Sequence, residues 1–149
     1  MLKPIAIATA ISGSLDILFA MILTLAFGRQ ISGMLRYVGS GPFPQAMDMG
    51  ATGAILGLVV HFALMAIMAT VLMFYLRANP AQLDKAIMVG LVYGLLTYLV
   101  MNLVVVPLRF GTPLPPKTLS IATQLFAHIF LVGIPMVLVA KKYLRPQLG

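Results

Sequence analysis

Four long apolar runs dominate the sequence and limit the folds open to it. They cover residues 5–27, 50–76, 86–108 and 119–139, with few polar residues inside them. About 20 apolar residues in a helix cross the hydrocarbon core of a bilayer, so each run is long enough to span it. With 61% hydrophobic and only 9% charged residues among 149, the chain has too little polar surface for a soluble domain. The sequence predicts a single-domain, all-α membrane protein with four transmembrane helices in one bundle.

The ten Lys and Arg residues all lie outside the apolar runs. They are scattered along the chain, which argues against nucleic-acid binding and fits contact with lipid phosphates. Four spans place both termini on one side, which has six basic residues against four on the other. By the positive-inside rule, we expect both termini to be cytoplasmic. The six are Lys3, Arg77, Lys85, Lys141, Lys142 and Arg145, and the four are Arg29, Arg36, Arg109 and Lys117.

A short helix is predicted at residues 29–38, between the first and second spans. Ile31, Met34, Leu35 and Val38 recur at helical spacing, and polar residues occupy the other face. This amphipathic pattern is typical of a helix that lies in the membrane interface.

Prolines mark two further features of the helices. Asn79 followed by Pro80 predicts an N-cap and a first helical residue, so the third helix is expected to begin before its lipid-embedded part. Within the fourth span, Pro135 has no N–H to give to the carbonyl of Leu131, which predicts a kink.

Six polar side chains lie inside the apolar runs, where lipid makes them costly. Counted from the ends of their runs, the three ionisable ones reach a similar depth, near the bilayer midplane. Small residues at helical spacing accompany them, notably the glycine pairs 53/57 and 90/94, and should let helix backbones approach one another. We therefore expect one inward-facing polar cluster. The six residues are Asp16, His61, Tyr98, Asn102, Gln124 and His128.

Two interpretations of these polar residues are open from sequence. They can hold the helices together by hydrogen bonds, or they can form a site that handles protons, ions or a small polar solute. His61 and His128 could also ligate a haem b iron, or a metal ion together with Asp16. No single helix has the paired spacing that makes a metal motif specific, so no cofactor is predicted. Without cysteine and without phosphate-loop, zinc-helix or nucleophile-elbow motifs, the chain is not expected to be an enzyme.

Several short segments spread over most of the chain occur here together. They are Gly13-Ser14-Leu15-Asp16, Leu58-Val59-Val60-His61-Phe62, Tyr93-Gly94, Met101-Asn102, Pro107-Leu108, and His128 ahead of Val132-Gly133-Ile134-Pro135. In combination they resemble the small multi-pass bacterial inner-membrane proteins described as YagU-like, a group of unknown function. The resemblance implies a bacterial inner membrane and a multi-pass helical fold, and it assigns no residue roles.

Three functions therefore follow as expectations. The first is a membrane protein with a polar midplane site, assembled as a homo-oligomer because one small bundle leaves little room for a pathway. The second is an accessory or assembly subunit of a larger membrane complex, contacting it through the glycine faces and the interfacial helix. The third is a membrane protein that binds haem or a metal ion.

Overall fold

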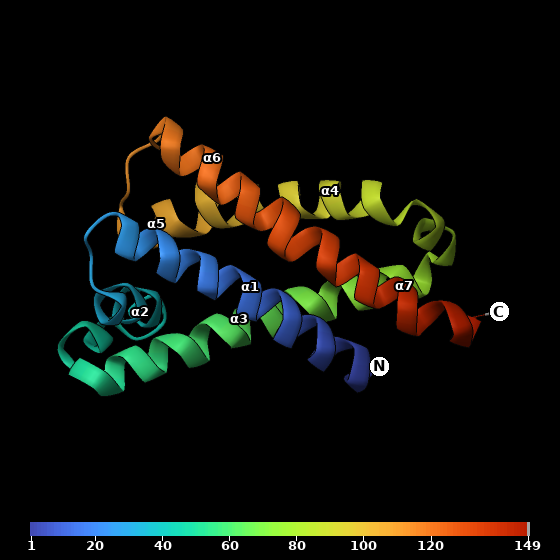
Figure 1. Ribbon diagram of the computed structural model, residues 1–149, viewed down its shortest axis with the longest axis horizontal. Helices are drawn as coiled ribbons and strands as arrows, with labels where there is room; N and C mark the ends of the chain where they lie inside the picture. The colour runs from blue at the N-terminus through green and yellow to red at the C-terminus, as the bar shows by residue number, and fades with distance from the viewer. Residues whose placement is uncertain (149) are drawn as a thin grey trace.

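The computed structural model describes residues 1–148, and every regular element within them is helical. Four long helical segments run roughly side by side along one axis, and both ends of the chain lie at the same end of the bundle (Figure 1). The predicted fold is confirmed. The first span is α1 (Leu2–Ala26) and the second is α3 (Gly50–Ala78); the third joins η2 (Pro80–Lys85), α4 (Ala86–Tyr98), η3 (Leu99–Val105) and α5 (Val106–Phe110); the fourth joins α6 (Thr118–Phe126), η4 (Ala127–Gly133) and α7 (Ile134–Leu148).

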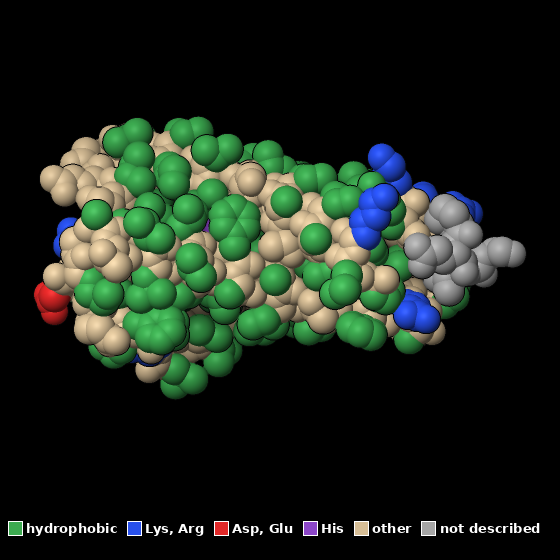
Figure 2. Space-filling model, turned by 90° about the horizontal axis from the view of Figure 1, so that it is seen from below, with side chains coloured by type: hydrophobic (Ala, Val, Ile, Leu, Met, Phe, Trp, Pro, Cys, Tyr) green, Lys and Arg blue, Asp and Glu red, His purple; other side chains and the backbone are tan. Residues whose placement is uncertain are grey.

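Four helices are long and apolar enough to cross a membrane, at Leu2–Ala26, Gly50–Ala78, Pro80–Phe110 and Thr118–Arg145. Most extend past the apolar runs, because polar and basic residues at the interface continue the helical hydrogen bonding. Large apolar side chains cover the outer surface; Ile22 is 64% exposed and Ile55 65%. Lys and Arg gather toward the two ends of the molecule, with an apolar surface between them (Figure 2). This distribution is that of a membrane protein, whose apolar belt faces lipid.

The helices pack in an order that differs from their order in the chain. The second span packs on α1, α1 packs on the fourth span, and the fourth span packs on the third. At the end that holds the termini, α3 also contacts α7, and the apolar core fills this half of the bundle. Its largest fully buried side chains are Leu72, Met73, Leu76, Leu83, Met136 and Leu144.

The predicted short helix is present as α2 (Ile31–Gly39), followed by the turn η1 (Pro44–Asp48). It lies crosswise to the long helices, at the end of the bundle away from the termini (Figure 1). A β-carbon added to Gly57 would lie 1.8 Å from the carbonyl oxygen of Leu35, and one added to Gly53 would lie 2.0 Å from that of Ala46. The glycine pair of α3 therefore receives α2 and η1, so α2 packs on the second span as well as facing the interface.

The second glycine pair joins the third and fourth spans. A β-carbon at Gly94 would lie 2.5 Å from the carbonyl oxygen of His128, and one at Gly133 would lie 2.3 Å from that of Gly90. Only residues without a side chain allow this approach. Both glycine pairs are thus occupied by helices of the same chain.

Each of the last two spans contains a π-helical segment just before a proline. The N–H of Val106 donates to Met101 and that of Ile134 to Ile129, five residues back in each case, and the next residues are Pro107 and Pro135. A proline ring clashes with the carbonyl four residues earlier, and a wider turn relieves that clash. At Pro135, where the sequence predicts a kink, the helix accommodates the proline with this wide turn.

The third span begins at Pro80, as expected, but as a 3₁₀ turn. Asn79 occupies the predicted N-cap position, but its side chain does not cap the turn. Its side-chain amide donates to the carbonyl of Tyr75, 3.0 Å away, at the end of α3, and no side chain caps the new turn. An asparagine at a helix junction can serve either helix, and here it serves the preceding one.

The connections opposite the termini are held together by one arginine. The guanidinium of Arg109 donates to the carbonyl of Ser40, 2.8 Å away, and to that of Gly41. Beside it, the rings of Tyr37 and Phe110 stack with centroids 4.3 Å apart. The end of the third span is therefore tied to the end of α2.

Candidate functional site

An aspartate and a histidine from neighbouring spans meet in the middle of the bundle. Asp16 of α1 and His61 of α3 lie with Oδ2 and Nδ1 3.9 Å apart. The side chain of His61 is 9% exposed and that of Asp16 is 19% exposed. Both residues lie near the middle of their helices. The sequence predicts that they reach a similar depth, and in the structure they are in contact.

The backbone of α1 determines which nitrogen of His61 carries a proton. Its Nε2 lies 2.9 Å from the carbonyl oxygen of Gly13, which can only accept a hydrogen bond, so Nε2 is the donor. The other nitrogen, Nδ1, faces Asp16. It can carry a second proton and face an Asp16 carboxylate, or stay bare and face a protonated Asp16. At 3.9 Å the contact is longer than a hydrogen bond.

Gly13 and its neighbour Ser12 explain why the helices approach one another closely here. A β-carbon on Gly13 would lie 2.7 Å from the ring of Phe62, so a glycine is needed for α3 to come this close. The Ser12 hydroxyl donates to the carbonyl of Val132 in the fourth span, 3.4 Å away. The sequence does not show that the Gly13 carbonyl is the hydrogen-bond acceptor of His61.

His128 lies in the π-helical segment η4 of the fourth span. Its Nδ1 donates to the carbonyl of Gln124, 2.9 Å away, which leaves Nε2 as the nitrogen free to accept. The ring of Tyr98 from the third span meets the imidazole edge to face, with centroids 6.0 Å apart, and Tyr98 is only 4% exposed. The segment η4 that holds His128 packs on α1, the helix of Asp16. Four of the six predicted residues therefore form two pairs on helices that pack together, Asp16 with His61 and Tyr98 with His128, and we call these four the polar cluster.

The other two predicted residues serve different places. The side-chain amide of Asn102 donates to the carbonyl of Tyr98 in its own helix, at 3.4 Å, and does not reach the cluster. Gln124 lines a pocket one helical turn from His128, toward the end opposite the termini. Asn102 and Gln124 thus share the helix faces of Tyr98 and His128, and each lies one turn away from its neighbour along the helix axis.

That pocket, which we call the loop-side pocket, has a volume of about 420 Å³ and lies between the end of α1 and the start of α6. Ala20 and Gln124 line it, and they lie one turn above Asp16 and His128 on their helices, about 6 Å along the axis. Its other lining residues are Leu23, Thr24, Phe27, Arg29, Met34, Lys117, Leu119, Ser120 and Thr123.

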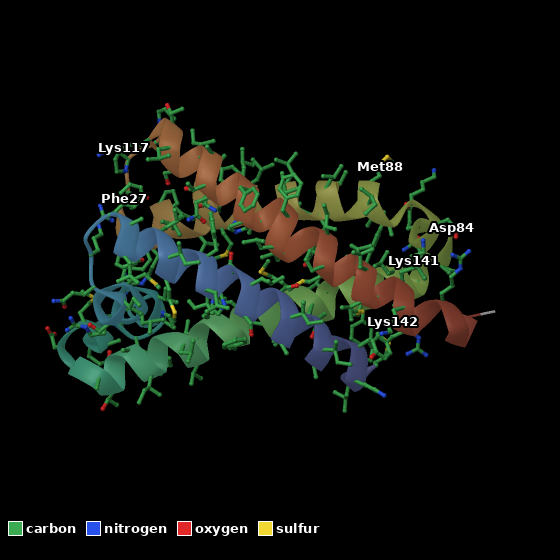
Figure 3. The ribbon with its side chains drawn as sticks, viewed as in Figure 1. Phe27, Asp84, Met88, Lys117, Lys141 and Lys142 are labelled. Atoms are coloured by element: carbon green, nitrogen blue, oxygen red, sulfur yellow. The ribbon has the colours of Figure 1, made fainter. Side chains whose placement is uncertain are left out.

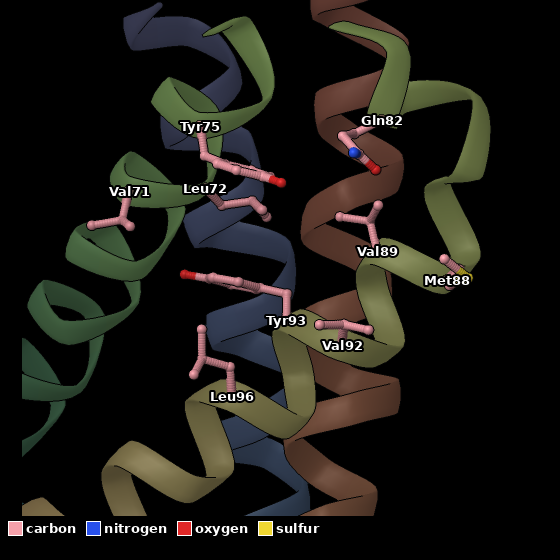
Figure 4. A pocket seen from close by; sticks show the side chains of 9 residues that line it. All are labelled: Val71, Leu72, Tyr75, Gln82, Met88, Val89, Val92, Tyr93 and Leu96. Atoms are coloured by element: carbon pink, nitrogen blue, oxygen red, sulfur yellow. The ribbon is translucent and has the colours of Figure 1, made fainter. Parts of the chain in front are cut away.

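A second cavity of about 490 Å³ opens between α3 and α4, nearer the termini (Figure 4). The Tyr93 hydroxyl donates to the carbonyl of Met68, 2.7 Å away, and so joins the two helices there. Tyr75 and Gln82 are the other polar residues in an otherwise aliphatic lining without a charged side chain. Such a cavity suits hydrocarbon rather than an ionic substrate.

The geometry of the cluster bears on whether it could hold a metal ion or haem. Among residues 1–148, no group of three or more His, Asp or Glu is arranged to hold a metal ion. Because the Nε2 of His61 is bonded to Gly13, a haem iron or metal ion would have to bind through Nδ1, which faces Asp16, or His61 would have to release that carbonyl.

No protein-family model, curated protein or solved structure matches this chain. The YagU-like resemblance therefore stays a prediction, and the functional argument depends on the geometry alone.

Proposed function

We propose that this chain is a membrane protein that takes up and passes protons, or binds a small cation, through Asp16, His61 and His128. The observation that carries the proposal is the Asp16–His61 contact in the middle of the apolar bundle. Ionisable groups at this depth are costly, and in membrane proteins they commonly mark proton or ion pathways.

The chemistry of the pair follows from the tautomer of His61. A proton can move from the Asp16 carboxyl to Nδ1, breaking the O–H bond and forming an N–H bond, while Nε2 stays bonded to Gly13. The pair has zero net charge in both arrangements, which limits the cost of holding it in lipid. A proton taken from one side can thus be held by either group and passed on. His128 Nε2 offers a second acceptor, on a segment that packs on the helix of Asp16.

Access differs between the two sides of the cluster. Toward the termini, the packed apolar core separates the cluster from the surface. Toward the other end, the loop-side pocket comes within one helical turn. We infer that protons or ions enter from the loop side, and that transfer to the other side would require the core half of the bundle to open or a second subunit to complete the path.

The location belongs to the same proposal. The six-to-four distribution of basic residues favours cytoplasmic termini, and the resemblance favours a bacterial inner membrane. The loop-side pocket would then open to the periplasmic face.

Flux into proteoliposomes tests the proposal. We expect wild-type protein to pass protons, driven by a potassium diffusion potential and followed with an internal pH dye, faster than empty vesicles. Asp16→Asn and His61→Gln should each abolish the excess. The matched control is Asp48→Asn, which removes an exposed carboxylate at the end of η1 and should leave flux unchanged. Wild-type flux of protons, Na⁺ and K⁺ equal to that of empty vesicles would overturn the proposal.

The alternative function, an accessory subunit, requires a surface that contacts other proteins. The glycine faces that sequence reasoning offered as contact surfaces are filled by α2 and by the fourth span. An oligomer or complex would therefore have to use the aliphatic outer faces, and it stays a prediction.

A further inference from the structure

Two of the four basic side chains at the loop end are occupied within the protein. Arg36 donates to the carbonyl of Met47, 2.9 Å away, and Arg109 donates to Ser40 and Gly41. The side chains of the other two, Arg29 and Lys117, make no hydrogen bond or ion pair within the described residues. Both line the loop-side pocket. The pocket therefore holds two positive charges that no described carboxylate compensates.

The start of the fourth span adds hydrogen-bond donors to the same pocket. No side chain caps α6, so the first backbone N–H groups of the helix have no capping partner. They carry the positive end of the helix dipole. Ser120 in the first turn and Gln124 below it contribute a hydroxyl and an amide to the lining. Charges from two separate connections and a helix start thus converge on one hollow.

Apolar side chains form another part of the wall, beside Thr24 and Thr123. Leu23 and Phe27 of the α1 end and Leu119 of α6 line the pocket beside the charges. Phe27 and Lys117 lie at the same end of the bundle, far from Lys141 and Lys142 near the C-terminus (Figure 3). An occupant that satisfies both kinds of wall has an anionic head and an apolar tail.

We propose that the loop-side pocket binds a phosphate oxyanion, either the headgroup of an anionic phospholipid or a soluble phosphate. Arg29, Lys117 and the first N–H groups of α6 contact the phosphate oxygens, and Leu23, Phe27 and Leu119 contact the glycerol or the first methylenes of a lipid. Paired cations with backbone N–H groups form charge-assisted hydrogen bonds to phosphate. The apolar wall favours the lipid as the source, because a free phosphate leaves it uncovered. This site uses none of the titrating groups Asp16, His61 and His128, although its occupant would lie in the entry route proposed above.

Calorimetric titration of the purified protein in a neutral detergent tests the site with two probes, dodecyl phosphate and inorganic phosphate. Dodecyl phosphate should bind saturably. Arg29→Gln and Lys117→Gln should each raise its Kd about fivefold, and the double variant about 25-fold, because each cation near the surface contributes about that factor. The matched control is Lys85→Gln at the opposite end, which should leave the Kd unchanged.

Further titrations distinguish a lipid headgroup from a soluble phosphate and control for loss of folding. Tighter binding of dodecyl phosphate than of inorganic phosphate supports a lipid headgroup, and equal binding supports a soluble phosphate at the same site. Arg29→Lys keeps the charge and should restore binding, which distinguishes lost contact from lost folding. Asp16→Asn should bind dodecyl phosphate like wild type even if it abolishes flux. An unchanged Kd in the double variant, or an equal rise in Lys85→Gln, would overturn the site.

Discussion

Replacing Gly57 by alanine should separate α2 from the second span. The new β-carbon would lie 1.8 Å from the carbonyl oxygen of Leu35 and 2.6 Å from its carbonyl carbon. Non-bonded carbon atoms prefer a separation of about 3.5–4.0 Å, so one backbone must move by roughly 1.5–2 Å. Overpacking costs about 1–3 kcal/mol, and the upper end applies because both sides of the contact are backbone and cannot change rotamer. We expect about 3 kcal/mol of lost stability.

The same short helix supplies a matched control. Gly33 lies within α2 with no atom within 4 Å of its added β-carbon. Alanine there should be neutral or stabilise by up to about 1 kcal/mol, because it is the better helix former.

Unfolding measured by circular dichroism provides the comparison. The protein in dodecyl maltoside is titrated with sodium dodecyl sulfate, and the midpoints for Gly57→Ala, Gly33→Ala and wild type are compared. A Gly57→Ala midpoint equal to wild type would show that α2 does not pack on α3 as closely as the structure places it. A loss of equal size in both variants would point instead to a general effect of alanine in this region.

Three further predictions follow from the structure and the sequence. The Asp16→Asn and His61→Gln changes should be non-additive, with an interaction energy of at least about 0.5 kcal/mol in the same unfolding assay; strict additivity would refute the contact. Burial raises the pKa of Tyr37, so its phenol should ionise above the ordinary tyrosine range, as followed by the absorbance difference between wild type and Tyr37→Phe. The stability that Tyr37 contributes should be constant near neutral pH and decrease in strong alkali, where the unfolded chain loses the phenol proton first. Alkaline phosphatase fused after residue 111 should be active and after residue 149 inactive; the reverse result would invert the topology.

The sequence predicts the spans and the depth of the polar groups because both depend on distance along one helix. A bilayer requires about 20 apolar residues, and each run meets that requirement by itself. The constant rise per residue then places Asp16 and His61 at matching depths. Which side chains meet depends on rotation about each axis, and helices that are apolar on all sides give little periodic signal for that rotation. Asn102 and Gln124 do share the faces of Tyr98 and His128, but they lie one turn away along the axis, where Asn102 bonds within its own helix and Gln124 lines the loop-side pocket.

The partners of the glycine pairs were also beyond the sequence. A pair four residues apart indicates that some backbone approaches closely, but it carries no information on which one. For Gly53 and Gly57 the partner is a crosswise helix and a turn, brought there by the first connection. For Gly90 and Gly94 it is the fourth span, which follows the third in the chain.

The two π-helical segments link the prolines to the polar residues of the last two spans. Asn102 lies in the first segment and His128 in the second, ahead of Pro107 and Pro135. Both side chains donate to the carbonyl four residues earlier in their own helix. In a π turn the backbone N–H reaches five residues back, so a polar side chain within the turn can supply a donor to a carbonyl that the shift leaves short of one.

This helical role separates the members of the cluster by function. One nitrogen of His128 supports the fourth helix, whereas the contact between Asp16 and His61 joins two helices and leaves a proton to be shared between them. Removing the imidazole of His128 would disturb the π turn as well as the cluster, and loss of flux in such a variant would have two explanations. Changes at Asp16 and His61 leave the π turns intact. The test of proton transfer therefore depends on Asp16 and His61. The role of His128 is better assigned from the pH dependence of flux, compared between wild type and a His128 variant in which Asp16 and His61 are both kept.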